Sequence, residues 1–296
     1  MDIKLLETFN AVMEAQSMTG AARLLGLTQP AVSTQVARLE AQLGFPLFER
    51  VNGRLKASDQ GRVFHREVRN VLGRIEKLGE DAKSIRAGVI ENIVVASHPS
   101  ASISLMPSVV KELLELRPKS RVRMINRTSE EVRSIFETGV ADVAIAEWPI
   151  HIPNIELRRY VVPCVAILPA NHPLAKLDAI TPADASDIPF IAMPDTRLIG
   201  HRIRSAFVEA GASFTPAAES EYFSAICGLV AAGCGISIVD KWSAETFRPL
   251  GLAVKRFEPF IGYEIGVFRR NYDSPNLLVD ELIDVIDRQL STNASQ

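Results

Sequence analysis

The residues best suited to recognition chemistry lie between positions 19 and 43, in the run TGAARLLGLTQPAVSTQVARLEAQL. Gln29 can hydrogen-bond the edge of a DNA base, and Ser33 lies one helical turn further on. Small and polar side chains on one face would let the first half of a helix approach a major groove closely. The predicted DNA-contacting residues are Gln29, Pro30, Ser33, Thr34 and Arg38, joined by Arg50 and Arg54 further along the chain.

Two short helices separated by a turn must position these side chains. Gly26 permits a sharp bend, Thr28 can cap the second helix, and Pro30 falls in its first turn, where a missing N–H costs nothing. An apolar stripe at helical spacing then faces the body of a small domain: Val32, Val36, Leu39 and Leu43. By itself, this pattern also fits an ordinary helical hairpin of a soluble protein.

The flanking segments favour the first interpretation. Upstream, a second apolar stripe could brace the helix pair, at Ile3, Leu6, Phe9 and Val12. Downstream, residues 44–50 lead into Asn52, Gly53 and Arg54, and an Asn-Gly pair is typical of a hairpin tip. A helix pair followed by a basic hairpin predicts a winged helix-turn-helix over residues 1–60, with double-stranded DNA as its partner.

The same segment resembles the LysR-type bacterial transcriptional regulators. The resemblance runs through many positions at fixed spacing: Phe9, Ala21, Ala22, Leu24, residues 28–33, Gln35, Leu39, Glu40, Leu43, Gly44, residues 47–50 and Gly61. The chain departs from the family at the end of the wing, where ASDQG at 57–61 replaces the usual Leu-Thr-x-Ala-Gly run. Ser58 can still cap the next helix, so the departure affects local packing rather than the expected fold.

A long helix with a narrow apolar seam is predicted over residues 58–88. The seam residues alternate between steps of four and three: Phe64, Val68, Val71, Ile75, Leu78, Ala82 and Ile85. This spacing is typical of a two-stranded coiled coil, whereas a helix on a globular core usually shows a broader apolar face. Gly73 and Gly79 each weaken the helix by roughly 1 kcal/mol relative to Ala, so we expect dimer contacts to hold it. A dimer predicts an operator with two inverted half-sites.

Composition fits a soluble protein of about two domains. The 296 residues are 47% hydrophobic, and no run approaches ~20 apolar residues, so we expect neither a membrane span nor a signal peptide, and a cytoplasmic location. Residues 1–90 hold 13 basic against 10 acidic side chains, and the remainder holds 20 against 25. This asymmetry has the right sign for DNA but is weak, so affinity would depend on where individual arginines lie.

From position 91 onward, short apolar runs alternate with amphipathic helices, which predicts an α/β effector domain of two lobes over residues 91–296. Lobe I would hold residues 91–161 and 267–296, and lobe II residues 162–266. Strands are expected at 93–96, 121–125, 143–146, 161–168, 190–192 and 236–239, and helices at 102–116, 129–138, 199–210, 223–232 and 277–289. The apolar run 261–268 would cross back to lobe I, so that two strands connect the lobes as a hinge beside a cleft.

This half also resembles LysR-type regulators, through ADVAI at 141–145, LPANHPL at 168–174 and VAAGCGI at 230–236. The resemblance implies a fold shared with periplasmic binding proteins, which close two lobes on a small solute. It also implies that closure changes how the dimer holds DNA, and that effector domains pair to give a homotetramer. No cofactor is implied.

Ligands of open α/β sheets bind outside the carboxyl ends of strands and at helix N-termini. After the first strand stand the hydroxyls of Ser97, Ser100 and Ser102, which suit a carboxylate, and Thr128 follows the second strand. In the family, the positions that match Ser100 and Thr128 commonly line the effector pocket. The resemblance thus predicts a small-molecule effector between the lobes.

Other interpretations apply to several of these positions. Ser102 and Ser129 could cap their helices, and Trp148, after the third strand, could either wall the cleft or pack. The candidates in lobe II are His201, Arg202 and Phe223. A faint similarity to regulators of opine and amino-acid catabolism, over residues 195–203 and 222–239, favours an amino-acid-like effector over other carboxylates.

The cysteines leave one functional alternative open. Cys164, Cys227 and Cys234 lack metal-site spacing, and an odd count in a cytoplasmic chain argues against a disulfide framework, so packing is their expected role. Because some LysR-type proteins are thiol switches, Cys227 and Cys234 could instead make this chain a redox-sensing regulator. Cys234 lies among small residues, where a compact side chain is expected on steric grounds alone.

Enzymatic interpretations find no support in the sequence. There is no G-x-S-x-G elbow, phosphate-binding loop, G-x-G-x-x-G motif or H-E-x-x-H motif, and the 5 histidines lack metal-ligand spacing. We therefore expect a chain that is not an enzyme and binds no metal. An enzyme with a DNA-binding domain, and a solute-binding protein that uses this domain only to dimerise, are the alternatives.

Overall fold

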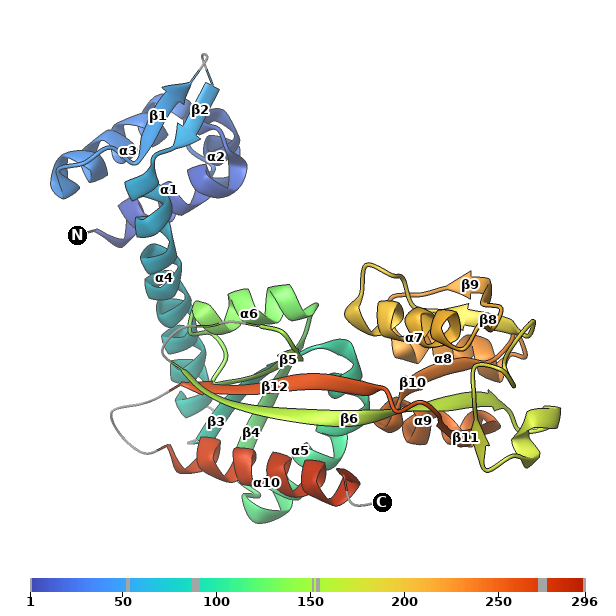
Figure 1. Cartoon of the computed structure of the whole chain (residues 1–296). Coiled ribbons are helices and arrows are strands. Elements are labelled where there is room, and N and C mark those ends of the chain that lie inside the picture. Colours follow the sequence, from blue (N-terminus) through green and yellow to red (C-terminus); the bar gives the residue numbers. More distant parts are fainter. Residues whose placement is uncertain are drawn as a thin grey trace. The chain divides into compact units, whose positions relative to one another are not determined.

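The computed structural model describes residues 2–51, 54–86, 91–150, 152, 155–270 and 276–294 (Figure 1). The chain divides into two compact units, Met1–Val89 with Ser134–Ala141 and Ile90–Arg133 with Asp142–Gln296. Within the described residues, no helix has both the length and the apolar character that a membrane crossing requires.

The first unit contains the predicted winged helix-turn-helix. Its elements are α1 (Ile3–Ala15), α2 (Met18–Leu25), α3 (Gln29–Leu43), β1 (Phe48–Val51) and β2 (Arg54–Ala57). Gly26 ends α2 in the left-handed conformation, with φ of 64°, and Thr28 caps α3 by accepting a hydrogen bond from the backbone of Ala31. Strands β1 and β2 pair antiparallel, while the predicted Asn52-Gly53 tip lies outside the described residues.

Apolar side chains from all three helices form the core of this domain. The predicted stripe of α3 turns inward, with Val32, Val36 and Leu39 buried, and Phe9 of α1 is buried beside it. Ser58 caps the following helix as predicted, because its Oγ accepts a hydrogen bond from the backbone N of Gly61 at 2.9 Å. The departure from the family run at this point therefore leaves the cap intact.

Helix α4 (Asp59–Arg86) carries the predicted dimer seam, and the structure corrects its first part. Val68 is only 2% exposed and packs with Phe64 into the core of the DNA-binding domain, so these two side chains serve the domain itself. The other seam residues are exposed in the single chain: Val71, Ile75, Leu78, Ala82 and Ile85. Their contact with a second chain stays a prediction, and residues 87–88 of the predicted linker lie outside the described part.

The second unit is built on an eight-stranded mixed sheet with the order β4-β3-β5-β12-β6-β11-β7, and β10 also pairs with β6. The strands of this sheet are β3 (Glu91–Ser97), β4 (Ser120–Asn126), β5 (Val143–Glu147), β6 (Ile155–Pro169), β7 (Ala179–Ile180), β10 (Ser237–Asp240), β11 (Leu252–Phe257) and β12 (Gly262–Arg270). A small separate sheet pairs β8 (Pro189–Ala192) with β9 (Thr215–Glu219).

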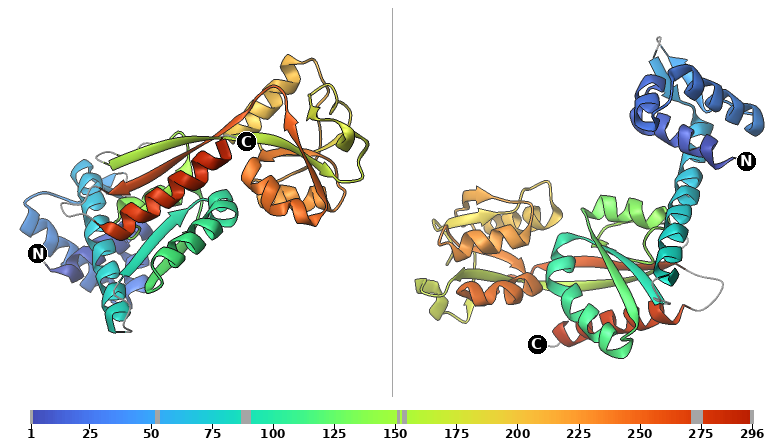
Figure 2. Two further views of the ribbon diagram at one scale, coloured as in Figure 1. Left: turned by 90° about the horizontal axis from the view of Figure 1, so that it is seen from below. Right: turned by 180° about the vertical axis from the view of Figure 1, so that it is seen from behind.

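From residue 91 onward, the helices follow the predicted alternation with strands. They are α5 (Met106–Leu116), α6 (Ser129–Glu137), α7 (Leu198–Glu209), α8 (Phe223–Ala231), α9 (Lys241–Phe247) and α10 (Leu277–Ala294), and a π-helical turn, η1 (Ala101–Leu105), precedes α5. In lobe I, α10 packs against α5 and along β3 and β6 (Figures 1 and 2). In lobe II, α8 and α9 pack against β10 and β6.

Two long strands connect the lobes, as predicted (Figure 2). β12 pairs antiparallel with β6 from Gly262, opposite Pro163, to Arg270, opposite Ile155, and also pairs with β5 of lobe I. Beyond this stretch, β6 pairs with β10 and β11 of lobe II. The two lobes are therefore joined by the same pair of strands, β6 and β12.

Four elements of the structure, β7, β9, α9 and β11, were not predicted from the sequence. These elements are short, and β9 has the sequence TPAAE, in which Pro and Ala have low strand propensity. β9 forms because it pairs in parallel with β8, and β11 forms because it lies between β6 and β7. Tertiary pairing overrides local propensity at these positions.

Candidate functional site

Five of the predicted DNA-contacting residues lie on the outer side of α3. Gln29, Pro30, Thr34 and Arg38 are exposed and Ser33 is half-buried. Gln29 Nε2 donates a hydrogen bond to Ser33 Oγ at 2.7 Å, which fixes the amide along the first turn. Because an amide has a second N–H and a carbonyl oxygen, groups remain to meet a base edge. The side chains of Arg50 and Arg54 lie outside the described part.

Polar contacts hold this helix against its neighbours. Gln35, on the inner side of α3, accepts a hydrogen bond from Thr8 Oγ1 of α1. Glu40 Oε1 accepts hydrogen bonds from the backbone N of Leu47 at 2.7 Å and of Phe48 at 3.2 Å. These contacts fix the start of the wing relative to α3, as a DNA-binding surface made of both elements requires.

In the second unit, a pocket of about 360 Å³ is lined by residues of both lobes. Lobe I contributes Pro99, Asn126, Thr128 and Glu131, and lobe II contributes Tyr222 and Ser224. This volume lies in the range of small-molecule sites. Thr128 thus stands on the wall of a pocket at the end of a strand, where the sequence analysis expected a ligand.

Thr128 also caps α6, so the structure corrects the idea that Ser129 does so. Thr128 donates to Glu131 Oε2 from its backbone N at 3.1 Å and from Oγ1 at 2.7 Å, and Glu131 N donates back to Thr128 Oγ1. This reciprocal arrangement is a capping box, and its hydrogen bonds lower the pKa of Glu131. Ser129 Oγ instead accepts a hydrogen bond from the backbone N of Glu147 at 3.0 Å.

The serines after β3 differ from the prediction. Ser97 and Ser102 are buried, and their hydroxyls bond to each other at 2.6 Å, so neither lines the pocket and Ser102 does not cap its helix. Ser100 is 8% exposed, and its Oγ donates to Asp240 Oδ2 at 2.9 Å. Ser100 therefore links lobe I to lobe II, and its hydroxyl proton is already committed.

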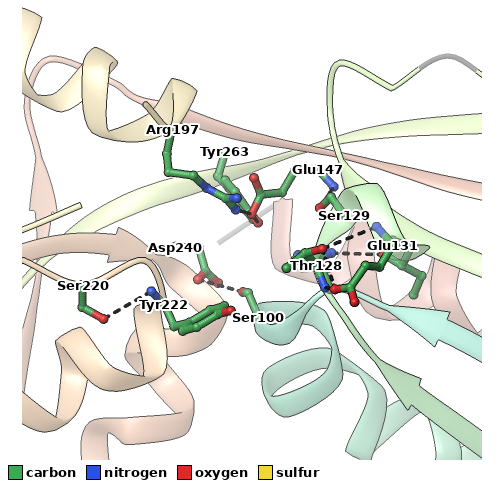
Figure 3. Close-up of polar contacts among 12 residues, drawn as sticks. Ser100, Thr128, Ser129, Glu131, Glu147, Arg197, Ser220, Tyr222, Asp240 and Tyr263 are labelled. Carbon is green, nitrogen blue, oxygen red and sulfur yellow. Dashed lines mark hydrogen bonds and ion pairs between the residues drawn. The ribbon is translucent and has the colours of Figure 1, made fainter. Parts of the chain in front are cut away.

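A polar cluster that the sequence analysis did not predict lies beside the pocket (Figure 3). Arg197, at the start of α7 in lobe II, donates from Nη2 to Glu147 Oε1 at 2.5 Å. Tyr263 of β12 donates from its hydroxyl to the same oxygen at 2.9 Å. Burial, together with the charge of Glu147, raises the pKa of Tyr263, so the phenol stays a donor. An ion pair thus joins the two lobes.

Asp240 and His98 are two further buried members of this cluster. Asp240, the last residue of β10, caps α9 through Ser243 N, and burial raises the pKa of its carboxyl group. His98 Nδ1 lies 3.2 Å from the carbonyl oxygen of Ile145, and the imidazole packs edge-on against Tyr263. Burial lowers the pKa of His98, which keeps the ring neutral.

The remaining candidates lie elsewhere. His201 and Arg202 line a different pocket, of about 500 Å³, and Arg202 bonds to Glu264 and to the carbonyl of Gly262 on β12. Phe223 is buried and packs edge-on against Tyr263, so its neighbours Tyr222 and Ser224 line the effector-sized pocket instead. Trp148 packs under the guanidinium of Arg159 and lines a narrow crevice of about 20 Å³.

Two of the cluster residues that were not predicted, Glu147 and Asp240, lie at the carboxyl ends of strands, where ligands of α/β sheets commonly bind. Glu147 ends β5, one residue before Trp148, and Asp240 ends β10. Charged side chains at these places are candidates for ligand contact in any α/β sheet. Arg197 and Tyr263 carried no such signal, because only the packing of α7 and β12 brings them to Glu147.

The cysteines do not form a pair prepared for oxidation. All three are free thiols; Cys164 and Cys227 are buried and Cys234 is exposed. Burial raises the pKa of Cys227 to about 12, so little reactive thiolate exists near neutral pH. Among the described residues, no group of three or more His, Cys, Asp and Glu side chains could hold a metal ion.

We expect Cys234 to react with a maleimide at pH 7.5 well before Cys227 and Cys164, because only Cys234 is exposed. Timed labelling of the native protein, followed by peptide mass spectrometry, measures the three rates separately. Equal labelling rates for Cys227 and Cys234, or a disulfide between them after peroxide treatment, would instead support a redox-sensing regulator.

Two protein families match the chain: the bacterial regulatory helix-turn-helix protein of the lysR family over residues 3–62, and the LysR substrate binding domain over residues 86–291. The chain is 28% identical over 281 residues to the transcriptional activator protein LysR of Escherichia coli, covering 94% of this chain and 90% of that protein. It is 26% identical over 280 residues to the octopine catabolism/uptake operon regulatory protein OccR of Rhizobium meliloti, covering 95% and 93%.

A solved structure shows the same fold. The crystal structure of CbnR, a LysR family transcriptional regulator, matches with a TM-score of 0.66 at 21% identity, over 98% of this chain and 99% of that chain. The two family matches cover the same two parts of the chain that the structure shows as a winged helix-turn-helix and a two-lobed α/β unit. The chain belongs to the LysR family of DNA-binding transcriptional regulators, with an N-terminal helix-turn-helix domain and a C-terminal effector-binding domain.

Proposed function

We propose that the protein controls transcription from an operator with two inverted half-sites, and that a small carboxylate-bearing or amino-acid-like metabolite bound between its lobes changes that control. The observation that carries the effector part is the pocket of about 360 Å³ lined by Thr128 of lobe I and Tyr222 of lobe II. A ligand that touches both lobes favours one arrangement of them through its differential affinity.

The assembly in this proposal is a cytoplasmic homotetramer. Dimers form through the exposed seam residues 71–85 of α4, and effector domains pair in addition. Residues 1–60 bind DNA, residues 58–88 join the dimer and residues 91–296 bind the effector. An effector coupling of roughly 1–3 kcal/mol would change DNA occupancy or bending by about 5- to 150-fold.

Three observations support this proposal over its alternatives. The relatives above are named as transcriptional regulators, which agrees with the expectation that the chain is not an enzyme. One of them is named for octopine catabolism and uptake, in line with an amino-acid-like effector. The buried Cys227 speaks against the redox-sensing alternative. A mobility shift on the gene's own upstream DNA separates a regulator from an enzyme or a solute-binding protein.

Thr128→Val tests the pocket itself, and Ser100→Ala tests the predicted ligand contact at Ser100, which bonds to Asp240 and does not line the pocket in this structure. A thermal-shift screen of the full-length protein against L-amino acids and small carboxylates supplies the ligand, and calorimetry measures its affinity. Loss of one hydrogen bond of roughly 1 kcal/mol predicts affinity at least about 5-fold weaker for Thr128→Val. DNA binding without the ligand should change less than about twofold, and Ser100→Ala should act in the same direction.

The matched control is Thr181→Val. Thr181 makes the same reciprocal contacts with Asp184 that Thr128 makes with Glu131, but it does not line the pocket. Thr181→Val therefore measures the cost of losing a cap alone. Full-strength ligand binding in the Thr128→Val, Ser100→Ala double variant would exclude these two residues as pocket contacts.

A further inference from the structure

An ion pair between oppositely charged side chains connects the two lobes. Glu147 of lobe I and Arg197 of lobe II form an ion pair, with side chains 26% and 29% exposed. The pair lies next to the effector pocket, because Ser129, which bonds to the backbone of Glu147, directly follows Thr128 on the pocket wall. Figure 3 shows Glu147 and Arg197 on one side of Thr128 and the Ser100–Asp240 contact on another.

The arginine offers a second, unused donor. Arg197 Nη2 donates to Glu147, whereas Nε is buried and has no hydrogen-bond partner among the described residues. A guanidinium binds carboxylates best through two parallel N–H groups, and the Nε and Nη2 edge presents such a pair. The present single contact with Glu147 uses only half of that edge. A carboxylate that approached Arg197 could use both donors.

The other side of the pair offers acceptors. A backbone carbonyl can only accept, so His98 Nδ1 carries the proton that is donated to Ile145, and Nε2 of the neutral ring is an acceptor. This Nε2 is buried in a residue 1% exposed and has no partner among the described residues. The charges of both Glu147 and Asp240 act on the His98 ring. The carboxylate of Glu147 can therefore accept hydrogen bonds from a cation, and His98 Nε2 is a further unpaired acceptor of the same cluster.

Electrostatics then selects the ligand class. A simple carboxylate that took Arg197 would leave Glu147 half-buried without its cation, next to a second negative charge. A simple amine that took Glu147 would leave Arg197 without its anion. Breaking this half-buried pair from one side is unfavourable, because the remaining partner keeps a charge that is only partly solvated. A molecule that carries both charges compensates both residues at once.

We infer that the effector is a zwitterion whose carboxylate binds Arg197 and whose protonated amine binds Glu147, so that it replaces the ion pair between the lobes. This inference rests on the proposed function, in which the effector binds between the lobes. The rest of the molecule extends into the pocket beside Thr128 and Tyr222. The free protein keeps the lobes linked by Glu147 and Arg197, and the ligand substitutes its own two charges as the link.

The first test compares probes that differ in one charge. Each of the twenty standard L-amino acids is measured by calorimetry on the full-length protein beside its deaminated acid and its decarboxylated amine; for L-valine these are 3-methylbutanoate and isobutylamine. In at least one such set, the amino acid should bind at least tenfold more tightly than either partner. Equal binding by a deaminated acid or an amine, or binding by no amino acid, would overturn the inference.

The second test moves the charges on the protein. Glu147→Gln should weaken binding of the amino acid at least tenfold and strengthen binding of its deaminated acid, because Arg197 is then free. Arg197→Gln should act in the opposite sense and favour the amine. The matched control is Arg204→Gln, which removes another arginine of α7 that pairs with Asp195 at 2.7 Å outside the pocket and should change nothing.

Each variant is first checked by thermal unfolding, and the probe comparison on the unaltered protein decides the matter even if one variant does not fold. The outcomes also separate the inference from the proposed function. If a deaminated acid binds as tightly as its amino acid, and Thr128→Val abolishes this binding, the zwitterion is refuted but an effector site between the lobes is still supported. If a ligand binds Thr128→Val and Glu147→Gln as tightly as it binds the unaltered protein, both the zwitterion and the proposed effector site are refuted.

Discussion

The Val71→Glu, Leu78→Glu double variant is expected to lose the dimer contact between two α4 helices. Both residues are exposed in the single chain, at 44% and 68%, and belong to the predicted seam. Each substitution would bury an unpaired charge between two helices, which a coiled coil does not tolerate. Two linked DNA-binding domains gain avidity, so operator affinity should also fall by about 100-fold or more.

Sedimentation velocity of the full-length protein measures this change, with Val63→Glu as the control. Val63 is 56% exposed on the same helix but lies off the seam, so the same substitution there should leave the assembly intact. Circular dichroism checks that the double variant remains folded. An unchanged oligomer in the double variant would refute the assignment of α4 as the dimer contact.

Gln29→Ala is expected to weaken specific operator binding by roughly 1–3 kcal/mol, or about 5- to 150-fold, and binding to random DNA much less. The side chain is exposed at the start of α3, and its hydrogen bond with Ser33 holds it in place. Ser33→Ala should act in the same direction, because it removes this support. Competition mobility shifts at one fixed salt concentration give both affinities.

Gln42→Ala is the matched control, because Gln42 is exposed at the other end of the same helix. It should change neither affinity, since only the N-terminal half of α3 is expected to enter the groove. Equal losses on specific and random DNA for Gln29→Ala would mean that Gln29 does not contact bases and contributes only general attraction.

The local part of this protein was determined by its sequence. In the DNA-binding domain, each helix end is set by neighbours within a few residues, such as Thr28 bonding to Ala31 and Ser58 bonding to Gly61. Apolar spacing then decided which side of α3 faces the core. The order of strands and helices in the two lobes followed from the same short-range patterns, apart from β7, β9, α9 and β11.

Only the tertiary structure decided which side chains lie between the lobes and how they pair. Glu147 and Arg197 are 50 residues apart in sequence, and Ser100 and Asp240 are 140 apart, so no local pattern relates their charges. Which hydroxyls face a ligand was equally hidden: Ser97 and Ser102 bond to each other, whereas Thr128 reaches the pocket. A residue type shows what a side chain can bind, but its partners depend on how two lobes, joined by β6 and β12, bring distant strand ends together.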